Sequence, residues 1–343
     1  MDSKFAVIGV GSPIVDSLAR VDDAFLAAHV RGAKGGMEMI GSEEMAALCA
    51  QLPTGAVTRA PGGAAANTVR GAGRLGARAA VVGKLGNDDN AAYYLEVMKR
   101  SGVDVSRFKH SAAAPNARCL SLVTPDAQRT MRTDLAAAAM LTPEEISAAD
   151  FAGAEYVYIE VYLLFNTELA EKVFACARAA GCKICLNFGS FEVVRALLPQ
   201  MREWVGKYVD LVFANTEEAR EFTGLKDARA EELALELASG CELAAVTDGA
   251  DGACVADKHG VTRVAALAPT ALVDTTGAGD FWAAGFLHGL ASGARAAAAA
   301  RVGAVLSREI IAVIGVELPE NTWESVRAEV RALLAADAAG AGK

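Results

Sequence analysis

Short apolar runs rich in β-branched residues alternate along this chain with longer segments whose hydrophobic residues recur every three to four positions. The short runs predict strands over residues 5–10, 79–82, 156–159, 184–187, 211–214 and 243–247. The clearest predicted helices are residues 167–180, 192–205, 228–238 and 322–336. This alternation predicts an α/β fold with a three-layer α/β/α core around a mostly parallel sheet. Ligands bind beyond the carboxyl ends of strands in such sheets, so the residues after each strand are the candidates for a site.

Two segments interrupt this alternation. Residues 18–40 contain the turn Lys34-Gly35-Gly36, while residues 118–124 and 129–133 flank a turn at 125–128 and look like a hairpin. We expect them to form a small, discontinuous β lid over the strand ends, from about 15–41 and 112–135 within a single domain of residues 1–343. The edge of such a lid either pairs with a second copy in a homodimer or stays solvated. The small, polar tail at 338–343 is expected to fray.

Charge and hydropathy exclude several classes of partner. The chain has 343 residues, a formal net charge of -9 and no block of lysines or arginines, which argues against nucleic acid and anionic membranes. The apolar run at 5–10 is too short for a secretory signal, and the Ala-rich stretch 283–306 is interrupted by charged residues. A cytoplasmic location is therefore expected.

Seven scattered cysteines predict reduced, mostly buried thiols. Cys182 and Cys185 form a CxxC pair, but they fall in a predicted strand whose side chains alternate between faces. Because no second pair or neighbouring histidine completes a metal site, we expect both to be structural.

The strongest chemical signal is residues 274–280, Asp-Thr-Thr-Gly-Ala-Gly-Asp, which an apolar run follows. The pattern predicts a strand end, a glycine loop and then a helix. Gly277 and Gly279 let the backbone approach a ligand, and the amides of residues 278–280 would form an anion site for a transferring phosphoryl group. Asp280 in the first helical turn can take a proton from an attacking hydroxyl. The alternative is that Asp280 only caps the helix and the glycines only turn the chain.

Two further motifs are weaker signals. Residues 61–67, Pro-Gly-Gly-Ala-Ala-Ala-Asn, precede a helix of small residues, and Asn67 can hydrogen-bond to hydroxyl groups or be satisfied within a tightly packed helix. The run Asn215-Thr216-Glu217-Glu218 follows a predicted strand. Its amide and carboxylate would order waters around the magnesium that accompanies ATP, and helix capping is the alternative.

Together the three motifs resemble the ribokinase family of carbohydrate kinases, also called the PfkB family, over nearly the whole chain. The family's N-terminal signature corresponds to residues 62–90, its C-terminal signature to 274–287, and its Asn-x-x-Glu element to Asn215 and Glu218. The resemblance implies a ribokinase-like fold and an ATP-dependent kinase that phosphorylates a hydroxyl group.

The resemblance also implies roles for individual residues. Asp280 is then the catalytic base, the backbone of Gly277, Ala278 and Gly279 forms the anion hole, and Arg129 approaches the transferred phosphate as the lid closes. Asp274 and Thr276 match positions where many relatives hold a monovalent cation, which adds potassium to the expected cofactors ATP and Mg²⁺. Glu218 contributes to magnesium binding through water. The residues assigned to nucleotide binding are Asn215, Glu218, Thr247, Gly249, Gly252, Thr276, Ala304 and Ser307, with the helix around Ile311 flanking the adenine.

For the phosphate acceptor, the residues that the resemblance assigns are Ser12, Asp16, Gly62, Gly63 and Asn67. Residues 129–138 and 280–286 resemble the adenosine kinase branch and favour a nucleoside such as adenosine. Adenosine kinases usually carry Asn where this chain has Ser12, which keeps a free sugar such as ribose or fructose as the alternative. Tyr162 and Phe165 follow a strand, where apolar aromatic residues more often pack in the core than stack on a base.

The resulting hypothesis is transfer of the ATP γ-phosphoryl group to a primary hydroxyl, with Asp280 taking the proton. Two other classes stay open. The run Ile8-Gly9-Val10-Gly11 resembles a dinucleotide-binding turn of an oxidoreductase, but Ser12-Pro13 follow and no third glycine opens a helix. A non-catalytic ligand-binding relative would keep the fold and lose the base, whereas Asp280 and its loop are intact.

Overall fold

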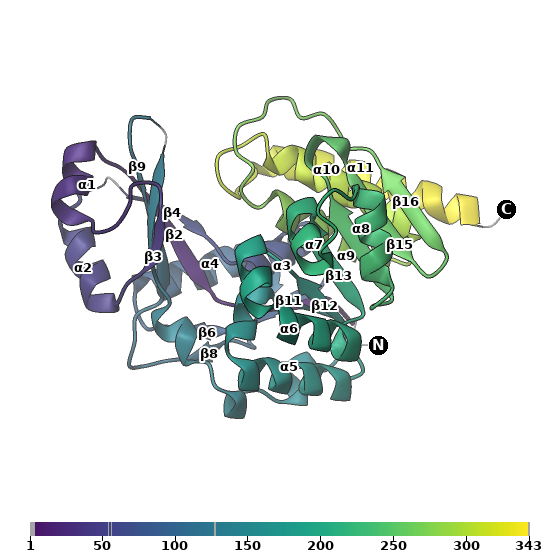
Figure 1. Cartoon of the computed structure of the whole chain (residues 1–343), viewed down its shortest axis with the longest axis horizontal. Helices are drawn as coiled ribbons and strands as arrows, with labels where there is room; N and C mark the ends of the chain where they lie inside the picture. The colour runs from purple at the N-terminus through teal and green to yellow at the C-terminus, as the bar shows by residue number, and fades with distance from the viewer. Residues whose placement is uncertain (1–3, 54, 56, 127, 342–343) are drawn as a thin grey trace.

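The computed structural model describes residues 4–53, 55, 57–126 and 128–341 and contains a large sheet, a small sheet and a two-stranded ladder (Figure 1). The large sheet has the strand order β16-β15-β14-β13-β12-β11-β1-β5-β7. Neighbouring strands from β7 to β14 are parallel, and β15 and β16 continue the sheet in antiparallel fashion. The strands are β1 (Phe5–Val10), β5 (Ala79–Val82), β7 (Val103–Asp104), β11 (Ala154–Glu160), β12 (Lys183–Asn187), β13 (Leu211–Asn215), β14 (Leu243–Thr247), β15 (Ala253–Asp257) and β16 (Gly260–Val264).

Helices cover both faces of the large sheet, which confirms the predicted three-layer α/β/α core. One face packs against α5 (Thr167–Ala179), α6 (Phe191–Tyr208), α7 (Thr216–Thr223) and α8 (Ala230–Ala238). The other packs against α3 (Ala64–Arg74), α4 (Asp89–Arg100), α9 (Ala278–Ala291) and α10 (Ala296–Ile310), and α11 (Glu320–Ala341) lies outside α9 and α10. The six predicted strands are confirmed as β1, β5, β11, β12, β13 and β14, whereas the sequence pattern did not indicate β7, β15 or β16.

The small sheet stands at one side of the large one and has the order β3-β10-β9-β2-β4 (Figure 1). Its strands are β2 (Ile14–Arg20), β3 (Met37–Met39), β4 (Val57–Pro61), β9 (Ala117–Val123) and β10 (Arg129–Asp134). The expected hairpin is present as β9 and β10, with Ala127 of its turn outside the described residues. The hydrophobic pattern did not indicate β4, which is antiparallel to β2.

Alternation along the strands gives the small sheet two different faces. One face carries Leu120 and Leu122 and is covered by α1 (Asp23–His29) and α2 (Ser42–Ala50), whose Leu26 and Leu48 pack against it. We call the opposite face, which carries Asp16, the inner face. The edge strands of this sheet are β3 and β4, and a homodimer that pairs through one of these edges stays a prediction.

Short elements complete the chain. A two-stranded ladder pairs β6 (Lys84–Leu85) with β8 (Lys109–His110). The 3₁₀ helices are η1 (Ala136–Met140), η2 (Pro143–Glu145), η3 (Ala148–Phe151), η4 (Val161–Phe165) and η5 (Gly249–Asp251). None of the helices in the described ranges is both long and apolar enough to cross a bilayer.

The expectation of a frayed tail was wrong for residues 338–341, which continue α11. Alanine has the highest helix propensity, and the Asp337 carboxylate accepts hydrogen bonds from the backbone amide and Nε of Arg295, at 3.0 and 2.8 Å. These contacts fix the last turns of the helix against the start of α10. Residues 342–343 lie outside the described ranges.

All seven cysteines are free thiols, as expected. Cys182 packs in the core on one side of the large sheet and Cys185 on the other. The two side chains therefore pack in different hydrophobic clusters, which confirms the structural interpretation of the CxxC pair.

Helices α9 and α10 pack closely because glycine lies at their contact. A Cβ at Gly303 would lie 2.7 Å from the Trp282 carbonyl oxygen and 3.0 Å from its ring, closer than such atoms approach. Gly206 in α6 is the matched contrast, since a Cβ there would meet nothing within 4 Å.

We predict that Gly303→Ala lowers the free energy of unfolding by about 1–3 kcal/mol through overpacking. Gly206→Ala should instead raise it by about 0.5–1 kcal/mol, because alanine is the better helix former. Urea denaturation of both variants measures the two effects. Equal stability of the two variants would contradict the proposed contact.

Candidate active site

The glycine loop before α9 has the geometry of an anion site. Gly277 is the N-cap with a φ of 74°, and a Cβ there would lie 2.7 Å from Val316 Cγ1, so glycine is required. Of the three amides predicted to bind an anion, that of Ala278 donates to the Thr275 carbonyl at 3.2 Å and is already used. The amides of Gly279 and Asp280 have no hydrogen-bond partner among the described residues, and a Cβ at Gly279 would meet nothing within 4 Å. The open cradle therefore consists of two amides.

Asp280 joins this helix to α3. Its carboxylate Oδ2 accepts a hydrogen bond from Asn67 Nδ2 at 3.0 Å, and Thr68 Oγ1 lies within hydrogen-bond distance, 3.2 Å, of the Asp280 carbonyl. Asn67 is 6% exposed. Burial raises the pKa of Asp280 to about 7, the Asn67 amide opposes this by lowering it, and the nearby carboxylates of Glu160 and Glu218 raise it further. A carboxyl group with a pKa near neutrality is suited to accept a proton at physiological pH.

The predicted acceptor residues also gather beside α3. Gly62 has no room for a side chain, because a Cβ there would lie 2.5 Å from Asp16 Oδ2. Gly63, the N-cap of α3 with a φ of 94°, would bring a Cβ to 2.5 Å from the Ser12 carbonyl oxygen. Burial raises the pKa of Asp16 to about 6, and its carboxylate has no hydrogen-bond partner within the described ranges. It is therefore free to accept hydrogen bonds from hydroxyl groups of a ligand.

Glu160 is a site residue that the sequence reasoning missed. It is 3% exposed at the end of β11 and accepts hydrogen bonds from the amides of Ser12, at 2.6 Å, and Ala65, at 3.3 Å. It thereby ties the connection between β1 and β2 to the first turn of α3. Burial raises the pKa of Glu160. The only sequence signal for it was a carboxylate at the end of a central strand.

Asn215 and Glu218 form a reciprocal capping box at the start of α7. Asn215 Oδ1 accepts from the Glu218 amide at 2.9 Å, while the Glu218 oxygens accept from the backbone and side-chain nitrogens of Asn215 at 2.9 and 2.8 Å. Glu218 is 6% exposed, and burial raises its pKa to about 7. The capping interpretation is thus confirmed, and both carboxylate oxygens are engaged within the protein.

Asp274, Thr276 and Arg129 meet where the small sheet approaches the glycine loop. Asp274 Oδ1 accepts from the amide and hydroxyl of Thr276 at 3.0 and 2.7 Å, and Oδ2 accepts from the Gly315 amide at 2.9 Å. Burial raises the pKa of Asp274, but these hydrogen bonds outweigh it and hold the pKa below its usual value. The guanidinium of Arg129 lies 3.6 Å from Asp274 Oδ2. This ion pair brings Arg129 of the small sheet to the acidic residue that opens the glycine loop, and its approach to a transferred phosphate stays a prediction.

The residues predicted to bind nucleotide follow neighbouring strands on the same side of the fold. Thr247 ends β14 next to Asn215 in β13, with its Oγ1 3.5 Å from the Ala214 carbonyl. Gly252 is fixed by the turn itself, because it has a φ of 97° and a Cβ would lie 2.1 Å from the Val264 carbonyl oxygen. Gly249, also at positive φ, has open space around it. Ala304 is buried and Ser307 half-buried in α10.

Tyr162 and Phe165 were expected in the core, and this expectation was wrong. They lie in η4 after β11 and are 49% and 58% exposed. The pKa of Tyr162 is raised, first by partial burial and then by the negative charges of the carboxylates of Glu160, Glu218, Glu192 and Asp280.

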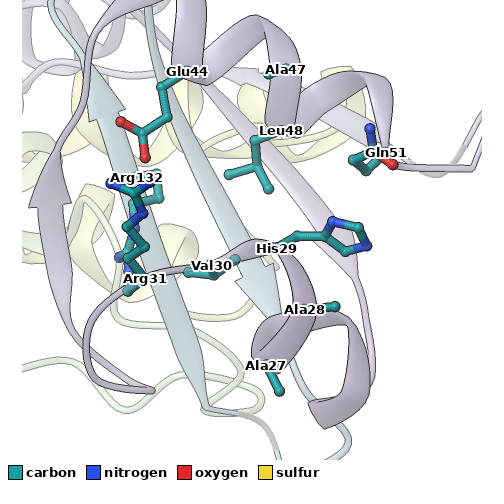
Figure 2. Close-up of a pocket in the computed structure, with 10 residues that line it drawn as sticks. All are labelled: Ala27, Ala28, His29, Val30, Arg31, Glu44, Ala47, Leu48, Gln51 and Arg132. Atoms are coloured by element: carbon teal, nitrogen blue, oxygen red, sulfur yellow. Dashed lines mark hydrogen bonds between the residues drawn. The ribbon is translucent and has the colours of Figure 1, made fainter.

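The structure also has a cavity that lies away from this site. It has a volume of about 570 Å³ and is bounded by α1, α2 and the covered face of the small sheet (Figure 2). Leu48, His29 and Arg132 line it, and no predicted site residue does.

Comparisons with known proteins agree with this geometry. The sequence profile of the pfkB family carbohydrate kinases matches residues 32–323. Adenosine kinase of Schizophyllum commune is 26% identical over 95% of this chain and 99% of its own length. The crystal structure of adenosine kinase from Sinorhizobium meliloti superposes with a TM-score of 0.82 at 30% identity, covering 95% of this chain and 100% of the other. A probable sugar kinase from Rhizobium etli CFN 42 gives the same TM-score and identity, covering 96% and 99%.

The relatives include both nucleoside and sugar kinases, with the adenosine kinases matching over nearly the full chain. Their shared fold is the ribokinase-like α/β architecture described above. The profile match extends over more than half of the sequence and includes Asp280 and its glycine loop. This chain belongs to the pfkB family of carbohydrate kinases, which are phosphotransferases with an alcohol group as acceptor.

Proposed function

We propose that this protein transfers the γ-phosphoryl group of ATP to a primary hydroxyl of a nucleoside, with adenosine favoured and with Asp280 as the general base. The observation that carries the proposal is the Asp280 carboxylate, which accepts a hydrogen bond from Asn67 at 3.0 Å, beside two amides at the start of α9 that have no partner among the described residues. A proton acceptor next to an anion cradle is the arrangement that phosphoryl transfer to a hydroxyl requires.

In this reaction the acceptor oxygen forms a bond to the γ-phosphorus, the bond from that phosphorus to the β–γ bridging oxygen breaks, and ADP leaves. Asp280 takes the proton of the attacking hydroxyl. The Gly279 and Asp280 amides donate to the oxygens of the transferred group, and Arg129 adds positive charge from the small sheet. Asp16 orients the acceptor through its other hydroxyl groups.

The described residues include no group of three or more histidine, cysteine or acidic side chains suited to hold a metal ion. They fit a magnesium ion held mainly by ATP phosphates and water, near the capping box of Asn215 and Glu218. Magnesium bound in this way supplies charge neutralisation on the phosphate oxygens. A potassium requirement through Asp274 and Thr276 and a cytoplasmic location remain predictions.

The inner face of the small sheet supports a nucleoside as acceptor. Strand register places Ile14, Leu18, Met131, Met37 and Met39 on the same face as Asp16. Met37 and Met39 are 54% and 55% exposed, which leaves apolar surface available to a flat base. The exposed ring of Tyr162 provides a second apolar surface at the site.

A free sugar such as ribose or fructose is the second candidate acceptor. Ser12 favours it, because adenosine kinases usually carry Asn at this position, and so does the similarity to the probable sugar kinase from Rhizobium etli. A non-catalytic ligand-binding relative is a third class, which would bind these ligands without releasing ADP.

We predict that Asp280→Asn lowers kcat by about 100-fold or more while ATP and acceptor still bind, because a positioned base is lost. Single-turnover kinetics and calorimetric titration measure the two effects. Asp227→Asn, an exposed acid-to-amide change of the same size, is the control and should behave as the parent. Parental turnover in Asp280→Asn would remove Asp280 from the mechanism.

The pH dependence of kcat should report the ionisation of Asp280. A base acts in its deprotonated form, so kcat should fall below a midpoint near the Asp280 pKa of about 7 and reach a plateau above it. Steady-state assays at saturating substrates between pH 5.5 and 9 measure this profile. A rate that is constant down to pH 5.5 would contradict an essential base with this pKa.

Release of ADP with a panel of acceptors tests the substrate class. We expect adenosine to give the highest kcat/KM, above other nucleosides, ribose and fructose, since only a nucleoside uses both Asp16 and the apolar inner face. Met39→Gln should then lower kcat/KM for adenosine more than kcat/KM for ribose. Assays with and without potassium test the monovalent cation in the same experiment. A higher kcat/KM for ribose or fructose than for adenosine would favour the sugar kinase alternative. Binding of an acceptor without release of ADP would favour the non-catalytic relative.

A further inference from the structure

Arg70 is a buried cation that the site described so far does not use. It lies in α3, is 4% exposed, and follows Asn67 by three residues, which places both side chains on one face of the helix. Its Nη1 is 3.4 Å from Asn67 Oδ1, and its Nη2 is 3.4 Å from the Val316 carbonyl and forms an ion pair with Glu317. Arg70 therefore connects the partner of Asp280 to the segment between α10 and α11.

The contact with Arg70 determines which way the Asn67 amide faces. A guanidinium has only donors, so it stabilises the orientation in which Oδ1 faces Arg70 and Nδ2 faces Asp280. In the flipped amide, Nδ2 would face the cation and Oδ1 would face the carboxylate. That orientation stabilises a protonated Asp280, which can no longer accept a proton.

We propose that Arg70 is a positioning residue that fixes the Asn67 amide with its donor toward Asp280 and so keeps this carboxylate ionised. The inference rests on the proposed role of Asp280 as the base. The same guanidinium binds the Val316 carbonyl, and the Val316 side chain packs against Gly277, the N-cap that precedes the two cradle amides. Arg70 thus supports both parts of the catalytic arrangement.

The energetics of Arg70 favour a role beyond stability. Its Nε is buried and has no hydrogen-bond partner among the described residues, and an unsatisfied buried donor is unfavourable. Glu317 is 45% exposed and remains solvated without Arg70. Replacing a buried ion pair by an apolar side chain is often neutral or stabilising, so stability alone does not require an arginine here.

Arg74 provides a matched control on the same helix. It lies one turn after Arg70, pairs with Glu320 as Arg70 pairs with Glu317, and also has a buried Nε without a partner in the described part of the chain. Both arginines line one cavity of about 220 Å³, together with Phe281, Val316 and Trp323. No hydrogen bond joins the Arg74 side chain to Asn67 or Asp280.

Other groups also act on Asp280 and must stay constant in the test. Glu160 from β11 and Glu218 from α7 face it with negative charge, and Tyr158 and Tyr162 lie within electrostatic range. None of these residues contacts Arg70 directly. Substitution of Arg70 therefore changes the orientation of Asn67 without altering these four groups.

The experiment compares Arg70→Met and Arg74→Met with the parent. Protein labelled with ¹³C at the aspartate carboxyl carbons is titrated by NMR, and Asp280→Asn assigns the Asp280 signal. We expect the parent to titrate near its pKa of about 7 and Arg70→Met to titrate about one pH unit higher. Arg74→Met should titrate as the parent. In kinetic assays, Arg70→Met should be about fivefold slower at pH 7 and approach parental kcat by pH 9, because only the ionised fraction differs.

Added guanidinium should restore the parental titration to Arg70→Met, because the adjacent cavity can admit it. An unchanged Asp280 titration in Arg70→Met, or an equal shift in Arg74→Met, would overturn the proposal. If Arg70→Met does not fold, Arg70→Gln replaces it, because a glutamine amide offers both a donor and an acceptor and no charge to Asn67. An upward shift of the Asp280 titration in Arg70→Gln supports the proposal, and an unchanged titration refutes it. The NMR titration does not depend on enzymatic activity. If Arg70→Met shifts the Asp280 titration but neither the parent nor any variant releases ADP, the positioning role of Arg70 is supported and the proposed kinase reaction is rejected.

Discussion

The contact between α3 and α9 is the constraint on which the rest of the site depends. A carboxylate at a helix start has to be enclosed enough for its proton affinity to rise, yet it must still ionise near neutral pH. Burial raises the pKa of Asp280. The Asn67 amide, which donates to its carboxylate at 3.0 Å, lowers the pKa again and so favours ionisation. Small residues on both helices, such as Gly71, whose added Cβ would lie 2.6 Å from Ala284 Cβ, allow the two helices to approach this closely.

The same closeness explains why the glycines of this chain fall into two groups. Gly62, Gly63 and Gly277 are required by the protein itself, since a side chain would strike Asp16, Ser12 or Val316. Packing within the protein does not require glycine at positions 279 and 249, because nothing lies within 4 Å of an added Cβ there. Open space at a glycine beside unpartnered amides is what close approach of a phosphate group would need.

Much of the fold could be predicted because hydrophobic period and strand-end position are local signals. Six central strands and the glycine loop before α9 were found in this way. Pairing between distant segments leaves little local trace, and β4 therefore went unpredicted. Glu160 and Arg70 were missed for the same reason, because their partners are separated from them in sequence by up to 247 residues. The Ala278 amide was assigned to the cradle although a turn bond to Thr275 occupies it, a detail set by backbone geometry.

Asp16 belongs to the small sheet, whereas Asp280 belongs to a helix of the large one. An acceptor held by the first carboxylate reaches the second only if its reactive oxygen lies at the right distance from its anchoring hydroxyl groups. If Asp16 binds the acceptor as proposed, the spacing between the two sheets limits which acceptors can place a hydroxyl group at Asp280. Glu160 accepts hydrogen bonds from the amides of Ser12 and Ala65, close to the places where the chain leaves and re-enters the small sheet, and these bonds restrain the position of that sheet.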